Sequence, residues 1–174
     1  LNYRKRWYTD GRRERYYLDV DGVLPNDGWF KIENVNSSTG AVTENWYYAQ
    51  ASGAVLKDGY KELDGHTYYF DANGYNYRNR WITLENGNRR YLGEDGARVT
   101  GWQYLEIPDN WSDDEDVEDY INEHGTTYAW FYFSRNGKKK YSPGGKREMN
   151  VDGVTYCFDD DGIMHFGWVK LSST

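Results

Sequence analysis

The chain has 174 residues, of which 38% are hydrophobic, 18% aromatic and 28% charged, and its formal net charge is −7. This acidic balance argues against general nucleic-acid binding, which needs a basic surface. No apolar run approaches the ~20 residues of a membrane span, so no membrane insertion is expected. The single cysteine, Cys157, excludes an intrachain disulfide and a cysteine metal cluster.

Aromatic side chains supply most of the material for a core. The chain has 8 Trp, 18 Tyr and 6 Phe, and Tyr and Trp favour strands because each buries a ring while its polar tip stays in water. The 19 glycines and 3 prolines are typical of many short strands joined by glycine turns.

Six strand-like segments follow one another along the chain, and each has a glycine six positions after its first residue. The segments are 16–18, 47–49, 68–70, 90–92, 131–133 and 156–158, and the glycines are Gly22, Gly53, Gly74, Gly96, Gly137 and Gly162. Asp, Asn or Ser precedes each glycine, and Asp-Gly and Asn-Gly accept the positive φ of tight turns. The fixed spacing predicts six hairpin units.

An aromatic residue opens most of these units. The opening residues are Trp7, Trp29, Tyr60, Trp81 and Trp102, and Trp168 follows the sixth turn in the same way. The predicted units are 1–28, 29–59, 60–80, 81–101, 102–145 and 146–167, with 168–174 as the start of a further, truncated unit. The junction near Ser142 lacks the aromatic and is interpreted as divergent.

Units vary in length between the opening aromatic and the strand-like segment. This stretch is eight residues from Tyr60 to Tyr68, but twenty-nine from Trp102 to Phe131. The insertions are therefore expected to enter at the same hairpin turn of each unit.

The longest insertion carries an acidic run with Val117, Tyr120 and Ile121 at helical spacing. Ser112 is a candidate N-cap, and acidic residues in a first turn suit the helix dipole. A short helix is therefore predicted near Asp113 to Ile121.

These features together predict an all-β fold, a solenoid of stacked β-hairpin repeats with one short helix in an insertion. A lone hairpin is marginally stable in water, and stacking buries the aromatic faces of neighbouring units against one another. The end hairpins of such a stack are uncovered, so a homodimer formed through an end hairpin is also predicted.

Segments 53–60 (GAVLKDGY), 65–74 (GHTYYFDANG) and 153–168 (GVTYCFDDDGIMHFGW) resemble the cell-wall-binding repeats. That superfamily includes choline-binding modules, glucan-binding repeats and the C-terminal repeats of large clostridial toxins. The resemblance covers nearly the whole chain except the insertions. It implies a superhelical stack of hairpins, attached to a catalytic or surface domain elsewhere in a secreted protein of a Gram-positive bacterium, at the cell surface or in the cell wall.

In choline-binding members, a junction Trp, the Trp that opens a Trp-Tyr-Tyr strand and an aromatic of the next unit form a cage for the quaternary ammonium group. The strand-opening Trp is retained here at Trp46 and Trp130. The other units have Arg15, Thr67, Arg89 and Thr155 at this position. Because such cages are incomplete and an arginine repels a cation, the resemblance favours saccharide polymers, or no small ligand, over choline.

The candidate ligand-binding residues are those where the family pattern is best retained. Trp29 supplies the junction aromatic, Trp46 the strand-opening one, and Tyr68 of the following unit the third wall. Trp102 and Trp130 form the second pair, and the long insertion between them is a candidate cover for that site. An aromatic floor suits either a cation or the apolar face of a sugar ring. The alternative interpretation is that these rings are core residues.

The sequence thus predicts a non-catalytic module that binds cell-wall polysaccharide, teichoic acid or another surface glycan. No carboxylate pair for glycoside hydrolysis stands out, the acidic run near Asp114 matches no calcium loop, and no metal or cofactor is expected. The alternative is a structural spacer or protein-interaction solenoid that displays another domain.

Overall fold

The computed structural model describes residues 6–19, 21–111 and 114–172. The chain divides into two compact parts, Leu1–Arg80 with Leu92–Arg98, and Trp81–Tyr91 with Val99–Thr174. Within the described ranges, no helix is both long enough and apolar enough to cross a membrane.

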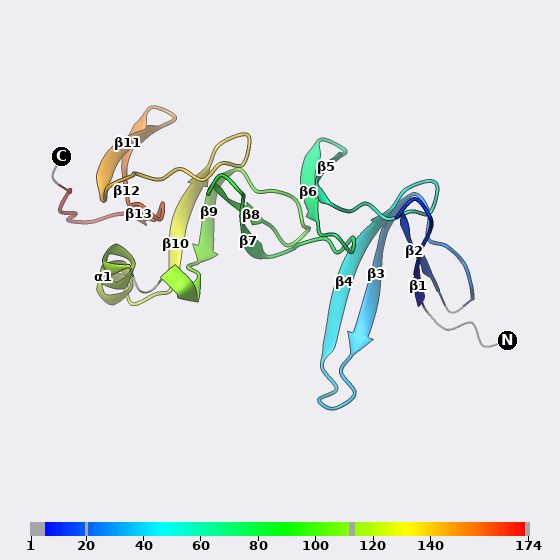
Figure 1. Ribbon diagram of the computed structural model, residues 1–174. Coiled ribbons are helices and arrows are strands. Elements are labelled where there is room, and N and C mark those ends of the chain that lie inside the picture. Colours follow the sequence, from blue (N-terminus) through cyan, green and yellow to red (C-terminus); the bar gives the residue numbers. More distant parts are fainter. Residues whose placement is uncertain (1–5, 20, 112–113, 173–174) are drawn as a thin grey trace. The chain divides into compact units, whose positions relative to one another are not determined.

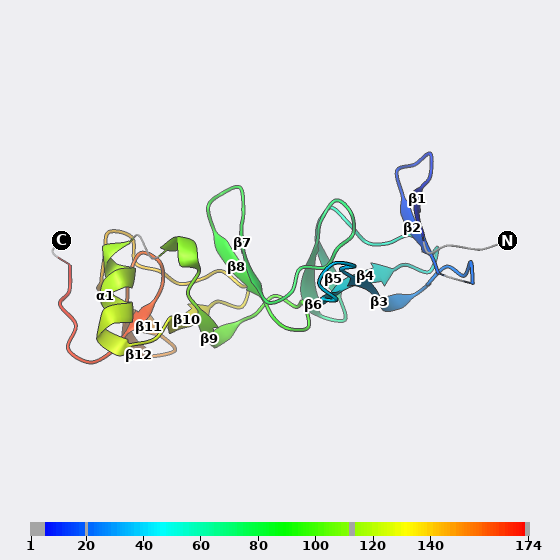
Figure 2. The ribbon, with the colours of Figure 1, turned by 90° about the horizontal axis from the view of Figure 1, so that it is seen from below.

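The first part is built from three β-hairpins (Figure 1). They pair β1 (Arg6–Thr9) with β2 (Arg15–Leu18), β3 (Gly28–Val35) with β4 (Val42–Ala49), and β5 (Gly59–Leu63) with β6 (His66–Phe70). Successive hairpins point in different directions, as β1–β2 and β3–β4 do in Figure 2.

The second part continues the same architecture and adds the helices. It holds most of β7 (Arg80–Thr83) and β8 (Arg89–Leu92), the pair β9 (Gly101–Glu106) and β10 (Tyr128–Phe133), and a sheet of β11 (Arg147–Val151), β12 (Val154–Phe158) and β13 (Met164–His165). A 3-10 helix η1 (Asp109–Trp111) and the helix α1 (Glu115–His124) lie between β9 and β10 in the chain. The predicted all-β fold of hairpin repeats, with one short helix in an insertion, is confirmed.

In the second and fifth units, the opening aromatic and an aromatic of the strand-like segment form a cross-strand pair. Trp29 lies opposite Tyr48 in the β3–β4 register, and Trp102 lies opposite Tyr132 in β9–β10. The ring centroids are 5.3 Å apart in both pairs. Paired aromatics of this kind stabilise antiparallel strands, which explains why the opening aromatic and the strand-like segment recur together.

The turn that follows each hairpin repeats in detail. At Gly74, the backbone N–H donates to Asp71 O at 3.0 Å, and the N–H of Asp71 donates to Tyr75 O at 3.0 Å. The same two bonds recur at the five other predicted turn glycines, and all six glycines have positive φ, between 70° and 83°. The fixed glycine spacing in the sequence therefore reflects one turn geometry, which L-residues with a Cβ adopt only with strain.

Backbone hydrogen bonds join successive units in the first part. The N–H of Val55 donates to Arg15 O at 2.8 Å, and the N–H of Asn76 donates to Trp46 O at 2.8 Å. Arg98 makes the equivalent bond to Thr67 O at 2.7 Å. In each case, the donor lies two residues after a turn glycine, and the acceptor lies one unit earlier in the chain.

The insertions enter between the two strands of a hairpin, as predicted. Between Trp29 and Tyr47 the added residues lengthen β3 and β4 to 8 residues each, and this hairpin is long in Figure 1. Between Trp102 and Phe131 the added residues form η1 and α1.

The helix α1 begins at Glu115 and ends at His124, where the sequence predicted residues 113–121. Its N-cap is Asp114, whose carboxylate accepts from the N–H of Asp116 at 2.9 Å. The candidate cap Ser112 lies outside the described residues. Val117 and Tyr120, which showed helical spacing, are the buried residues of the helix.

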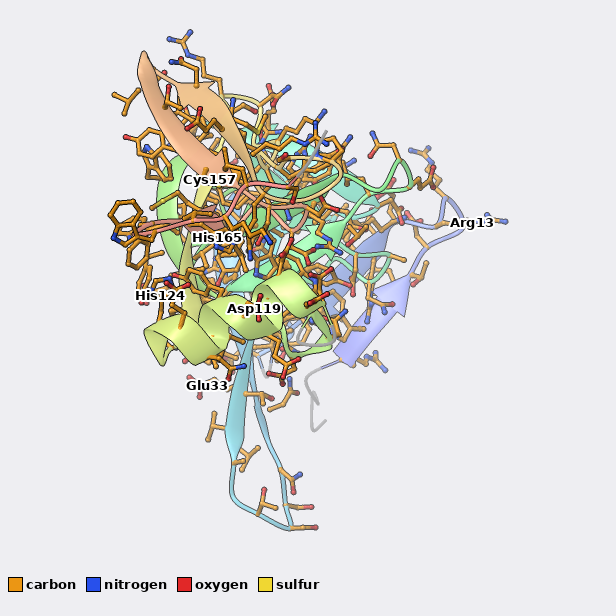
Figure 3. The ribbon with its side chains drawn as sticks, turned by 90° about the vertical axis from the view of Figure 1, so that its left-hand side faces the viewer. Arg13, Glu33, Asp119, His124, Cys157 and His165 are labelled. Atoms are coloured by element: carbon orange, nitrogen blue, oxygen red, sulfur yellow. The ribbon has the colours of Figure 1, made fainter. Side chains whose placement is uncertain are left out.

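The core of the second part lies between the insertion and the hairpins. Val117 and Tyr120 pack with Phe131, Phe133 and Ile163 in one buried cluster. The helix lies beside the strand that carries His165 (Figure 3), whose imidazole meets the Tyr120 ring edge-on with centroids 5.5 Å apart. The Nε2 of that imidazole is also 2.8 Å from Oδ2 of the buried Asp159.

Candidate glycan-binding surfaces

The three predicted residues of the first part lie around an arginine. The rings of Trp29 on β3 and Tyr68 on β6 are in contact, with centroids 4.9 Å apart. The guanidinium carbon of Arg78 lies 5.3 Å from the Trp29 ring centroid and 4.2 Å from that of Trp46 on β4. We call Trp29, Trp46 and Tyr68 the Arg78 cage.

Arg78 is held in place by a buried amide. Its Nε donates to Oδ1 of Asn76 at 2.9 Å, and one Nη donates to Glu94 O at 3.5 Å. Asn76 is fully buried, and its own Nδ2 donates to Tyr69 O at 3.1 Å. Burial lowers the pKa of Arg78 from its ordinary value, and the nearby Asp95 opposes this shift. The guanidinium stays charged, because arginine is not deprotonated in proteins.

An open, polar groove borders the Arg78 cage. Its lining residues are Glu44, Trp46, Tyr75, Arg78, Asn79, Glu94 and Asp95. The groove thus combines two aromatic rings with carboxylates, an amide and a guanidinium. Ligand sites combine apolar surface with a few placed hydrogen-bonding groups in this way, and the hydroxyl groups of a saccharide can both donate to and accept from them.

The predicted residues of the second part, Trp102 and Trp130, share one face of the β9–β10 hairpin. The register places alternate residues of both strands on this face. They are Trp102, Tyr104 and Glu106 on β9, and Tyr128, Trp130 and Tyr132 on β10.

The two tryptophans differ in exposure. Trp130 is 41% exposed, and its neighbours Tyr104 and Tyr128 are 48% and 41% exposed. The Tyr104 ring centroid lies 5.2 Å from that of Trp130 and 5.7 Å from that of Tyr128. Trp102 instead packs against Tyr156, with centroids 4.7 Å apart. We call Tyr104, Tyr128 and Trp130 the Trp130 face. Trp102 lies on the same face of the hairpin but is packed against the sheet that follows.

The long insertion packs on the opposite face of this hairpin. Trp111, Val117 and Tyr120 belong to the same buried cluster as Ala129 and Phe131, which alternate along β10 with the residues of the Trp130 face. The insertion therefore leaves Trp130 exposed.

A buried lysine forms a third cluster in the second part. The ammonium nitrogen of Lys139 lies 4.5 Å from the Trp111 ring centroid and donates to Asp161 O. Arg89 stacks on the same ring, with its guanidinium carbon 4.1 Å from the centroid, and pairs with the Asp161 carboxylate. Burial, with a further contribution from the charge of Arg89, lowers the pKa of Lys139 to about 7.

Sequence reasoning missed Arg78, Tyr104 and Tyr128. Tyr104 and Tyr128 alternate with the two predicted tryptophans, so strand alternation is the signal that could have found them. Arg78 carries no such signal, because the rings that it contacts belong to an earlier unit. Over the described part of the chain, no three His, Cys, Asp or Glu side chains gather closely enough to hold a metal ion.

Comparison with known proteins places the repeat in a family. A family model for the cell wall binding repeat matches residues 58–76. These residues include β5, β6 and the Gly74 turn, which are the features that recur along the chain.

The similar proteins are larger and bacterial. Glucosyltransferase-S of Streptococcus downei is 30% identical over 116 residues, which cover 67% of this chain and 7% of that protein. Toxin A of Clostridium novyi is 24% identical over 129 residues, which cover 57% of this chain and 5% of that protein. The chain thus spans less than a tenth of the length of these curated relatives.

A solved structure shows the same hairpin architecture. Choline binding protein F from Streptococcus pneumoniae, determined in the presence of a peptidoglycan analogue, is 29% identical with a TM-score of 0.61. The match covers 93% of this chain and 41% of that one. Fold, turn geometry and aromatic pairing therefore define a module of β-hairpin repeats. Residues 58–76 match the cell wall binding repeat, and the chain is similar to choline binding protein F and to the streptococcal glucosyltransferase.

Proposed function

We propose that this chain is a non-catalytic module that binds a cell-wall or surface glycan for a secreted or surface protein of a Gram-positive bacterium. The Trp130 face carries the proposal, because three aromatic rings stand more than 40% exposed together on one strand pair. Exposed aromatic groups that cluster mark an interaction site more often than single exposed residues do. The streptococcal relatives and the peptidoglycan analogue studied with choline binding protein F favour a glycan.

The groove beside the Arg78 cage is the second proposed contact. Trp46 offers an aromatic ring there, and Glu44, Asn79 and Asp95 offer polar groups. One stacking contact contributes about 0.5–2 kcal/mol, so each surface binds weakly. Retention on a polymer then depends on several contacts that act at the same time.

Retention on immobilised glycan tests the proposal. We expect Trp130→Ala to reduce retention on purified cell wall or on a polysaccharide resin, and Trp46→Ala to reduce it independently. The affinity loss that corresponds to one stacking contact is roughly 2- to 30-fold. Choline as a competitor shows whether the retained ligand is choline.

Trp168→Ala is the matched control, since Trp168 is fully exposed and lies outside both surfaces. Circular dichroism checks that each variant keeps its fold. If folded Trp130→Ala and Trp46→Ala variants are retained as well as the wild type, both surfaces are excluded as ligand contacts. A wild-type chain with no retention on any glycan favours the alternative, a structural spacer or protein-interaction solenoid.

The homodimer through an end hairpin stays a prediction. Light scattering at high protein concentration tests it.

A further inference from the structure

The Arg78 cage already contains a cation that belongs to the chain itself. The guanidinium carbon of Arg78 lies 4.2 Å from the Trp46 ring centroid and 5.3 Å from that of Trp29. Both distances fall within the ~6 Å over which a cation is attracted to an aromatic face. A positive charge of the chain itself therefore lies against two of the three rings of the cage.

The arginine is fixed there by more than the rings. Its Nε donates to Asn76 Oδ1 at 2.9 Å, and that asparagine is fully buried and bonded through its side chain and its backbone to Tyr69 O and Trp46 O. Because Asn76 is buried and hydrogen-bonded on both sides, its bond to Nε positions the Arg78 guanidinium against the rings.

The surroundings of the cage suit a cation. Glu44 and Asp95 line the groove beside Arg78 and act on its charge. Rings and carboxylates together would stabilise a positive group of similar size that took the place of the guanidinium. Quaternary ammonium ions are recognised by aromatic cages on this physical basis.

We propose that Arg78 determines the specificity of this site: its guanidinium occupies the cage and excludes quaternary ammonium ligands, and its removal creates a site for them. The arrangement recurs at the start of the chain, where the Arg15 guanidinium lies 4.1 Å from the Trp7 ring centroid. At both places, an arginine of the chain itself therefore covers an aromatic ring of the repeats. The inference goes beyond glycan binding and does not require it.

Titration with choline and with tetramethylammonium chloride tests the inference, with tryptophan fluorescence and the thermal midpoint as readouts and sodium chloride as the salt control. We expect no saturable response in the wild type. Arg78→Ala should give saturable binding at least about tenfold tighter than any wild-type response, and the ligand should raise its thermal midpoint. The double variant Arg78→Ala with Trp46→Ala should lose this binding.

Arg80→Ala is the matched control. It also removes a guanidinium stacked on an aromatic ring, 4.3 Å from the Tyr77 centroid, but not one that contacts Trp29 or Trp46. Arg78→Gln keeps a polar side chain that can bond to Asn76, and replaces Arg78→Ala if the alanine variant does not fold.

Two results overturn the inference. One is a saturable choline response in the wild type that Trp46→Ala abolishes, because the cage would then accept a ligand with Arg78 in place. The other is a folded Arg78→Ala or Arg78→Gln variant that gains no binding. Neither result depends on glycan retention, so failure of this inference and failure of the proposed function are distinguishable.

Discussion

Lys139 is a lysine whose side chain is almost fully buried. It is 5% exposed, lies against the Trp111 ring and donates to a backbone carbonyl. A cation–π contact and one hydrogen bond compensate in part for the loss of hydration. The lowered pKa, about 7, shows that the neutral amine is the form favoured by the fold.

The pKa of Lys139 predicts how stability depends on pH. The folded value of about 7 lies below the ordinary value of 10.5, so the unfolded chain binds more protons between these two pH values. The free energy of unfolding should therefore rise with pH from about 7, by at most about 1.4 kcal/mol per pH unit for this one group. Below pH 7, Lys139 is protonated in both the folded and the unfolded chain, so the cost of burying its charge fully lowers the free energy of unfolding.

Urea unfolding of wild type and Lys139→Met between pH 6 and 9.5 measures this effect. The stability of the wild type relative to Lys139→Met should increase as the pH rises from 7 to 9.5. Lys138→Met, which removes an exposed ammonium one residue away, is the control. If the free energy of unfolding of the wild type minus that of Lys139→Met is constant over this pH range, the prediction is contradicted.

Sequence reasoning located residues that recur and missed residues whose role depends on a distant partner. Trp29, Trp46 and Trp130 stand at repeated positions, so their place in the hairpins was predictable. Arg78 and Lys139 were not predictable, because the first contacts an earlier unit and the second contacts the insertion. Spacing within a unit carries no information about such contacts.

At the scale of the element, the glycine turn is the part of the fold that the sequence predicted in most detail. The six turn glycines have one geometry, with one pair of backbone bonds at each. The helix was also predictable, since Val117 and Tyr120 face the core as their spacing indicated. The backbone hydrogen bonds from one unit to the next, such as Asn76 to Trp46, were not predictable. Every residue except proline carries the same backbone N–H, so the sequence does not mark these donors.

Gly74 combines a positive φ with close packing against the preceding unit. Its φ is 83°, and a Cβ added there would lie 2.7 Å from Val55 Cγ2 and 3.0 Å from Leu56 O. We expect Gly74→Ala to destabilise the chain by about 2–5 kcal/mol, as the sum of backbone strain and overpacking. Thermal or urea unfolding measures the change.

Gly65→Ala separates the two causes. Gly65 has a similar φ of 78°, but nothing lies within 4 Å of an added Cβ, so this variant should lose only about 1–2 kcal/mol from strain. Equal losses in both variants would show that contact between units contributes nothing at Gly74.

At the scale of the whole molecule, the net charge of −7 constrains how a wall polymer is held. An acidic module repels teichoic acids and other anionic wall polymers, so its net charge opposes binding to them. We expect retention on cell wall to be unchanged or stronger when sodium chloride is raised from 0.05 M to 1 M, because salt screens the repulsion and leaves aromatic stacking in place.

Retention at the two salt concentrations, with an unrelated basic protein as the control, checks this expectation. The basic protein should be released by salt. Release of this chain by 1 M salt would indicate that binding occurs through a local cluster of basic residues and not through the Trp130 face.

The bond from Asn76 to Trp46, and its equivalents at Val55 and Arg98, have a consequence for how such arrays change over time. Each hairpin in the first part is completed by backbone that is synthesised one unit later. A recombination event that removes or adds one whole period rejoins equivalent backbone positions and keeps every such bond. An event out of phase leaves a hairpin without its partner. Copy number can therefore vary in steps of one unit, while each turn and each aromatic pair stays the same.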